Sequence, residues 1–182
     1  MTAAHGRTPE TAAAPEAGAA RTGPLAYVWA LARLSLGWVF LWAFLDKAFG
    51  LGHETPAKDA WINGGSPTQG FLAHGAVGPF AGLYHAIAGA TWADWLFMIG
   101  LLGIGLALIL GIGMRIAAAT GALLLVLMYT VVLPPENNVF MDDHLIYALL
   151  IIGLALAGAG DTLGLGRRWK RLSFVKDNPI LR

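Results

Sequence analysis

Residues able to exchange protons occur in two short groups of this sequence. Asp142, Asp143 and His144 follow one another, and a carboxylate and a cation are adjacent at Asp46 and Lys47. Histidine changes charge between about pH 5 and 8, and neighbouring carboxylates can accept or supply its proton. A nearby lysine would offset negative charge on a reduced or anionic ligand. We therefore take His144, Asp46 and Lys47 as candidate catalytic residues.

These side chains also have simpler interpretations. Asp142 or Asp143 could cap a helix that begins at this point, because Asp is among the preferred residues before a helix. Asp46 and Lys47 could mark the end of a hydrophobic helix at the membrane surface. The sequence leaves both alternatives open.

Metal or haem binding is a weaker interpretation of the histidines. Side chains of adjacent residues on a helix diverge, and the chain has no His-x-x-x-His pair, so we expect no metal site at 142–144. A haem between His144 and either His85 or His74 is an alternative that nothing in their spacing requires.

The elements that must position these residues are membrane spans. Residues 95–114 and 116–135 each contain 20 residues without a charged side chain. At about 1.5 Å per helical residue, each run can cross a hydrocarbon core of about 30 Å. The chain is 57% hydrophobic and 13% charged, against about 25% charged in soluble domains. The sequence therefore predicts an integral membrane protein whose partner is the lipid bilayer, and no nucleic-acid partner.

Composition divides the chain into three parts. Residues 1–24 are rich in Ala, Pro, Gly and Thr and predict a disordered tail. Residues 25–165 predict the membrane domain, and residues 166–182 form a basic tail. The expected spans are about 25–47, 95–113, 116–133 and 144–160. The first apolar run is longer than the core of a secretory signal, so we expect it to remain as a span.

The segment 50–93 has a different character. It has no charged residue between Asp59 and Asp94, yet its Gly and Pro content is too high for a span. Apolar side chains at helical spacing are Phe80, Leu83, Tyr84 and Ile87. They predict a short helix at the membrane surface, preceded by a turn-rich lid at 63–67. The predicted fold class is an all-α membrane protein: a four-transmembrane-helix bundle with a short interfacial helix and a lid loop on the outer face.

The distribution of basic residues predicts the orientation. With four spans both termini share one side, and that side carries nine of the twelve Lys and Arg residues. Cytoplasmic segments are enriched in these residues. We expect a multi-pass protein of the plasma membrane with both termini cytoplasmic. Arg33 falls near the inner side, and we expect its guanidinium to reach the headgroups along the helix surface.

Polar and aromatic residues are expected to gather around the candidate catalytic residues at the outer ends of the spans. Trp42 lies one turn before Asp46, Tyr129 lies near the end of the third span, and Tyr147 lies one turn after His144. Aromatic residues also form belts at membrane interfaces, which is the simpler interpretation. The candidate substrate- or cofactor-binding residues are Trp42, Trp61, Asn63, Gly64, Gly65, Ser66, Tyr129, Glu136, Asp143 and Tyr147.

Several stretches resemble the DoxX/DoxD family of membrane proteins. They are Leu-Ala-Arg-Leu-Ser-Leu-Gly at 31–37, Phe-Leu-Asp-Lys at 44–47, Trp-Ile-Asn-Gly-Gly-Ser-Pro-Thr-Gln-Gly at 61–70, Pro-Pro-Glu-Asn-Asn at 134–138, Asp-Asp-His at 142–144 and Gly-Ala-Gly-Asp-Thr-Leu at 158–163. The resemblance covers about residues 31–172, and the stretch at 61–70 is its most distinctive part. It implies a four-helix membrane protein tied to quinone-linked redox chemistry, like the membrane subunit of a thiosulfate:quinone oxidoreductase.

Three functions are consistent with the sequence. The first is the membrane subunit of a quinone-dependent oxidoreductase, with a quinone or small-anion site at the outer end of the bundle. With no cysteine, such a chain needs other oxidoreductase subunits for its electrons; it could also form a homo-oligomer. The second is a non-catalytic scaffold that recruits soluble redox or detoxification enzymes. The third is a small transporter. The lack of charged residues in the middle of the spans argues against it.

Overall fold

The computed structural model describes residues 23–182, and all regular secondary structure in this part is helical. Three helices are long and apolar enough to cross a membrane: α1 (Pro24–Phe49), α3 (Thr91–Leu110) and α4 (Met114–Val131). A fourth, α5 (Asp143–Leu156), is apolar but shorter, with 14 residues. The all-helical class is therefore confirmed, and three of the four expected spans coincide with helices that could cross a membrane. The predicted tail at 1–24 falls almost wholly outside the described residues.

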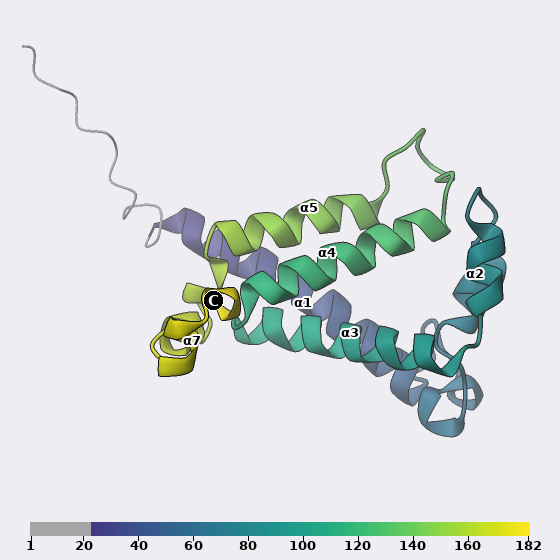
Figure 1. The fold of residues 1–182 in the computed structure, drawn as a ribbon, viewed down its shortest axis with the longest axis horizontal. Helices are drawn as coiled ribbons and strands as arrows, with labels where there is room; N and C mark the ends of the chain where they lie inside the picture. The colour runs from purple at the N-terminus through teal and green to yellow at the C-terminus, as the bar shows by residue number, and fades with distance from the viewer. Residues whose placement is uncertain (1–22) are drawn as a thin grey trace, which may run out of the picture.

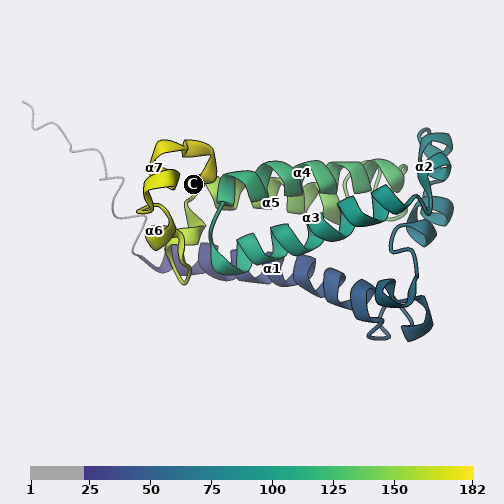
Figure 2. The same cartoon turned by 60° about the horizontal axis from the view of Figure 1, so that its bottom comes forward.

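The four apolar helices lie side by side, with short elements at both ends (Figures 1 and 2). We call the end with residues 50–90 and 132–142 the cap end, and the end with the α3–α4 turn and residues 157–182 the tail end. The short elements at the cap end are η2 (Ala57–Asp59), η3 (Trp61–Asn63), η4 (Phe71–Gly75) and α2 (Ala81–Ile87). Those at the tail end are η5 (Ala159–Asp161), α6 (Gly166–Trp169), α7 (Ser173–Asp177) and η6 (Pro179–Leu181).

Small residues let the helices pack closely in two pairs, α1 with α3 and α4 with α5. A Cβ placed on Gly105 would lie 2.9 Å from the backbone nitrogen of Leu41, so the α1–α3 contact requires glycine there. On α4, a Cβ at Gly121 would lie 2.5 Å from Ile151 of α5. Close backbone approach through small residues is the usual way for helices to associate in lipid. The core between the pairs contains Leu36, Phe40, Met98, Ile104, Leu108, Ile151 and Leu154.

The outer surface of the helices is apolar as well. Large exposed side chains include Leu31, Trp38, Leu96, Ile99, Leu123, Leu149 and Leu156. In water such a surface would be an aggregation site, whereas in lipid it is what a spanning helix presents. Together with helix length, this surface indicates a membrane protein.

Two glycines set the end of α3 and the start of α4. Gly111 has φ 70° and Gly113 has φ 58°, a left-handed region that favours glycine. These residues compress the α3–α4 connection into 111–113, so α3 ends at Leu110, a few residues before the expected boundary near 113. Helix α3 starts at Thr91, four residues before the expected 95, because its first turn includes polar residues that the charge-free run left out.

Arg33 corrects one sequence-based expectation. Its side chain is 0% exposed and does not reach along the helix surface to the headgroups. The guanidinium donates instead to the carbonyl oxygens of Leu108 and Ile109 in the last turn of α3. Further bonds go to the carbonyls of Ala159, Thr162 and Leu163 after α5. Last-turn carbonyls lack partners within a helix and favour a cation, so a buried arginine is stable there.

The expected short helix is present as α2, but its apolar stripe is divided. Tyr84 is buried and its hydroxyl bonds the Leu127 carbonyl and the Thr130 hydroxyl of α4. Leu83 and Phe80 are exposed at the surface of the cap end. A small apolar cluster of Leu72, Ala76, Tyr84 and Val131 fixes α2 and η4 to the end of α4. The cap end is thus a packed structure.

Candidate functional site

The start of α5 positions the best candidate for proton exchange. Asp142 is extended, with φ −139°, and its Oδ1 accepts from the backbone N–H of Leu145 at 3.2 Å. This is the N-cap arrangement expected for Asp before a helix, so the capping interpretation of Asp142 is confirmed. The cap uses one carboxylate oxygen and leaves the other available.

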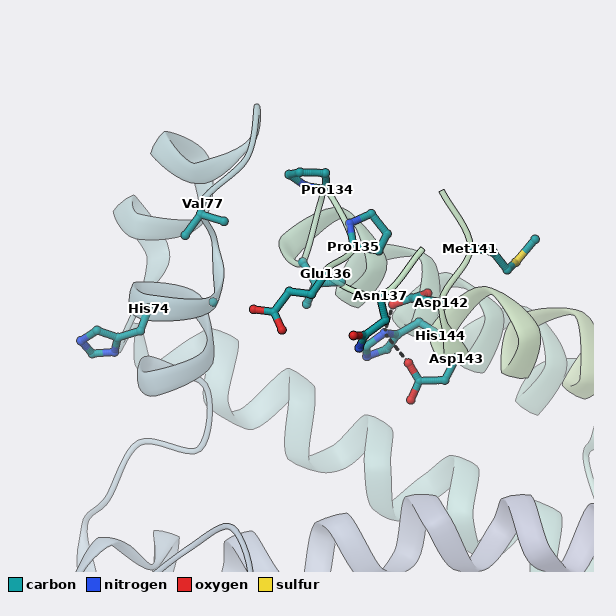
Figure 3. A pocket seen from close by; sticks show the side chains of 12 residues that line it. His74, Val77, Pro134, Pro135, Glu136, Asn137, Met141, Asp142, Asp143 and His144 are labelled. Atoms are coloured by element: carbon teal, nitrogen blue, oxygen red, sulfur yellow. Dashed lines mark hydrogen bonds and ion pairs between the residues drawn. The ribbon is translucent and has the colours of Figure 1, made fainter. Parts of the chain in front are cut away.

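His144 forms a hydrogen bond with that second oxygen of Asp142 (Figure 3). Its Nδ1 lies 2.6 Å from Asp142 Oδ2 and 3.7 Å from Asp143 Oδ1. Because an ionised carboxylate only accepts, the proton of a neutral His144 ring sits on Nδ1 and Nε2 keeps a free lone pair. The side chains of His144 and Asp142 are mostly buried, whereas Asp143 is exposed. A carboxylate that fixes the tautomer and orientation of a histidine in this way prepares it for acid–base work.

An open pocket of about 480 Å³ lies beside this pair, between the segment around η4 and the loop that joins α4 to α5. Its lining residues are His74, Gly75, Val77, Val132, Pro134, Pro135, Glu136, Asn137, Met141, Asp142, Asp143 and His144. Glu136 extends from the loop toward the segment that carries His74 and Val77, and the ring of His74 turns away from the pocket (Figure 3). Three carboxylates line the pocket, so its wall is acidic.

The loop at 134–142 is fixed by hydrogen bonds at its second half. Tyr129 of α4 donates its hydroxyl to the Phe140 carbonyl. The Asn138 side chain accepts from the backbone N–H groups of Phe140 and Met141. Tyr129 was expected to bind a ligand; in the structure it does not line the pocket but supports the loop that does.

Asp46 and Lys47 lie at a different place. The Asp46 carboxylate is buried and accepts from the backbone N–H groups of His53, Glu54 and Thr55 at 2.9–3.2 Å. Lys47 pairs with Glu54 at 2.9 Å. Neither residue lines the pocket. The end of α1 and the start of α5 lie on different sides of the cap end in both Figures 1 and 2, so the structure does not assemble Asp46, Lys47 and His144 as one site.

The predicted lid residues likewise make contacts within the protein, away from the pocket. Asn63 donates to the Ala57 carbonyl, and Gly64 has φ 88°, a left-handed conformation that favours glycine. A Cβ on Gly65 would lie 2.0 Å from the Asp59 carbonyl oxygen, so close chain approach, rather than a ligand, accounts for this glycine. Ser66 donates to Asp94 at 2.9 Å. None of these residues lines the pocket.

The remaining aromatic candidates also pack against the protein. Trp42 makes an edge contact with His53, with ring centres 5.1 Å apart. The ring of Trp61 meets that of Trp95 at 4.7 Å. Trp61 and Tyr147 pack against the main core. Of the thirteen candidates, the pocket therefore brings together Glu136, Asp143 and His144.

Asp94 is the residue that sequence reasoning missed. It is buried at the start of α3, and its Oδ1 accepts from the Thr68 hydroxyl at 2.6 Å and the Thr68 backbone N–H at 3.1 Å. Asp46 and Asp94 thus perform parallel tasks, each holding one part of the segment 50–90 against a helix. The one available signal was an acidic residue ending a long charge-free stretch.

The geometry at 142–144 also bears on metal binding. The ligand atoms of Asp142, Asp143 and His144 lie within 4.8 Å of one another. The expectation that adjacent side chains diverge fails here because Asp142 precedes the helix and its side chain folds back over the first turn. For haem, the His74 and His85 rings contact the carbonyls of Gly70 and Ala76 at 3.2 and 3.0 Å. These rings are engaged with their own segment rather than aimed at His144.

The fold and pocket define a class: a helical membrane protein with an acidic, histidine-containing pocket at one end. In comparisons with known proteins, no family model, no curated protein and no solved structure matches the chain.

Proposed function

We propose that this chain is the membrane subunit of a quinone-linked oxidoreductase of the DoxX/DoxD type, and that the pocket at its cap end binds the quinone ring. The observation that carries the proposal is the His144–Asp142 pair in a pocket at the end of apolar helices. Quinones reside in the bilayer, and their oxygens must exchange protons where water is available. The cap end offers that boundary.

The chemistry requires a proton donor and acceptor near a quinone oxygen. Conversion of a quinone to a hydroquinone consumes two electrons and two protons. A protonated His144 would donate from Nε2 to the ring oxygen, while Asp142 holds Nδ1 and stabilises the imidazolium. Glu136 and Asp143, which line the same pocket, would relay the second proton from water to the ring. Electrons would come from a partner subunit, since the chain has no cysteine for redox chemistry.

Charge favours a neutral ring over a small anion in this pocket. Glu136, Asp142 and Asp143 give the wall negative charge, which repels an anion such as thiosulfate. Lys47, which the sequence suggested as the compensating cation, pairs with Glu54 away from the pocket. We therefore place oxidation of any sulfur anion on a partner subunit, and only the quinone step on this chain.

The rim of the pocket is suited to a lipid-soluble ligand. Val77 is 75% exposed on one wall, and Val139 and Phe140 are 91% and 62% exposed on the loop that forms the other. Such side chains prefer the headgroup boundary to water. A quinone could enter between these walls directly from the outer leaflet.

The proposal includes a complete topology. We propose that α5 with the turn that follows it forms the fourth span of a four-helix bundle, and that residues 61–70 cover the ends of α1 and α3 on the outer face. The tail end would then be cytoplasmic in the plasma membrane, in keeping with the nine basic residues assigned to that side.

The test is binding of a short-chain quinone to the purified full-length protein. Wild type is expected to bind. His144→Gln lacks the imidazole that Asp142 orients, so its affinity for the quinone should fall about tenfold. His53→Gln is the matched control, because His53 lies outside the pocket.

Two results would count against the proposal. Absence of quinone binding by wild type would remove the quinone function. Wild-type affinity for the quinone in His144→Gln would remove His144 from the binding site. Either result would favour the alternative, a non-catalytic scaffold that recruits soluble redox enzymes.

A further inference from the structure

The C-terminal segment forms a compact structure fixed to the ends of two membrane helices. The backbone N–H of Leu165 donates to the Leu110 carbonyl at the end of α3, at 2.8 Å. The backbone N–H of Arg115 in α4 donates to the Arg182 carbonyl at 3.0 Å, and its guanidinium donates to the Pro179 carbonyl at 2.9 Å. Both ends of residues 165–182 are therefore tied to the α3–α4 turn, at the end opposite α2 (Figure 2).

This segment has its own small core. Val175 is fully buried. Trp169 donates its ring N–H to the Leu181 carbonyl, and its ring meets that of Phe174 edge-on with centres 5.4 Å apart. The segment is thus a defined surface, which we call the basic platform, comprising residues 165–182.

The exposed side of the basic platform carries unpaired cations beside apolar side chains. Arg167, Arg168, Arg171 and Lys176 are exposed. Among the described residues, no side-chain hydrogen bond or ion pair is made by any of these four. Lys170, by contrast, is neutralised by Asp161 at 2.7 Å. The exposed apolar neighbours are Leu172, Phe174 and Ile180.

The position of the basic platform decides what these cations meet. α3 and α4 have 20 and 18 residues, or about 30 and 27 Å at about 1.5 Å per residue. Their ends at Leu110 and Met114 therefore fall at the edge of the hydrocarbon core. A surface bonded directly to these ends lies at the level of the lipid headgroups. Cations at that level, with apolar side chains beside them, match the chemistry of phosphate groups above acyl chains.

We propose that the basic platform binds the headgroups of anionic phospholipids in the leaflet at the tail end. This inference is independent of the quinone proposal, because it concerns the opposite end of the molecule and no pocket residue. Each cation near an anionic surface is worth about a fivefold preference, and the effect is screened by salt. Removing three of the four cations should therefore remove most of the preference.

The experiment measures which lipids stay bound to the full-length protein. The protein is equilibrated in detergent micelles containing equal amounts of phosphatidylglycerol and phosphatidylcholine, and native mass spectrometry counts the retained lipids. Wild type should retain phosphatidylglycerol in several-fold excess. The triple variant Arg167→Gln/Arg168→Gln/Arg171→Gln should retain the two lipids about equally, whereas the corresponding triple Arg→Lys variant should keep the excess.

Two controls make the result specific. Lys58→Gln removes one exposed cation at the cap end and should leave the selectivity unchanged, whereas Arg168→Gln alone should lower it. Helix content and thermal unfolding of all variants in phosphatidylcholine micelles should match those of wild type, because the substituted side chains are exposed. Equal retention of both lipids by wild type would overturn the proposal. An excess that survives the triple Gln variant, or about 0.5 M salt, would overturn it as well.

Discussion

Replacement of Arg33 by methionine tests the most buried charged side chain in residues 23–182. The guanidinium is 0% exposed and donates to five backbone carbonyls, two in the last turn of α3 and three around η5. Methionine fills a similar volume but cannot donate to any of these carbonyls. Hydrogen bonds between membrane helices average about 0.6 kcal/mol each. Over five contacts the free energy of unfolding should fall by about 3 kcal/mol.

The assay is reversible unfolding in mixed micelles of a mild detergent and dodecyl sulfate, followed by helical circular dichroism. Arg33→Lys keeps the charge but concentrates its donors on one atom, which cannot span both groups of carbonyls. We expect this variant to lose about half as much, roughly 1.5 kcal/mol, on the same scale. Arg171→Met is the matched control; as an exposed surface substitution it should change stability by no more than about 0.5 kcal/mol.

Two results would contradict the role given to the Arg33 guanidinium. If the free energy of unfolding of Arg33→Met lies within about 1 kcal/mol of that of the Arg171→Met control, the carbonyls find other partners. Full wild-type stability in Arg33→Lys would show that charge near the helix end matters and the branched guanidinium does not.

Three further predictions concern the cap end and the topology. Gly65→Val should lower the thermal unfolding temperature, because its Cβ would overlap a backbone carbonyl; Gly103→Ala, whose Cβ meets open space, should not. Asp94→Ala should speed amide hydrogen exchange at residues 66–69, since three hydrogen bonds to that carboxylate are lost; unchanged exchange would contradict its anchoring role. A reporter active only outside the cytoplasm should be silent after Arg115 and active within residues 55–66, and the reverse pattern would invert the proposed orientation.

Much of the secondary structure follows from local sequence. Long charge-free runs force helices in lipid, because a backbone without water must satisfy its own hydrogen bonds. The short stripe at 80–87 likewise predicted α2. The exact ends depended on glycine conformation, as at Gly111, where composition alone placed the boundary a few residues too late.

The candidate site was predicted less completely. His144 and Asp143 were chosen for their chemistry, and the structure places them in one pocket with Glu136. Asp46 has the same chemistry but serves the backbone of residues 53–55. Nothing in the residue type distinguishes these outcomes, because the difference lies in which groups the fold brings near each carboxylate.

By itself, the sequence determined that this is an all-helical protein with long apolar helices suited to a bilayer, since hydrophobic run length and backbone hydrogen bonding act locally. It also offered Asp142 or Asp143 as the cap of the helix that follows, and the structure shows that Asp142 has this role. Only the tertiary structure decided that Arg33 is buried, that Asp94 anchors the cap end and that Lys47 lies apart from His144. These outcomes depend on contacts between residues distant in the chain, and the free energy of a charged side chain depends on the partners those contacts provide.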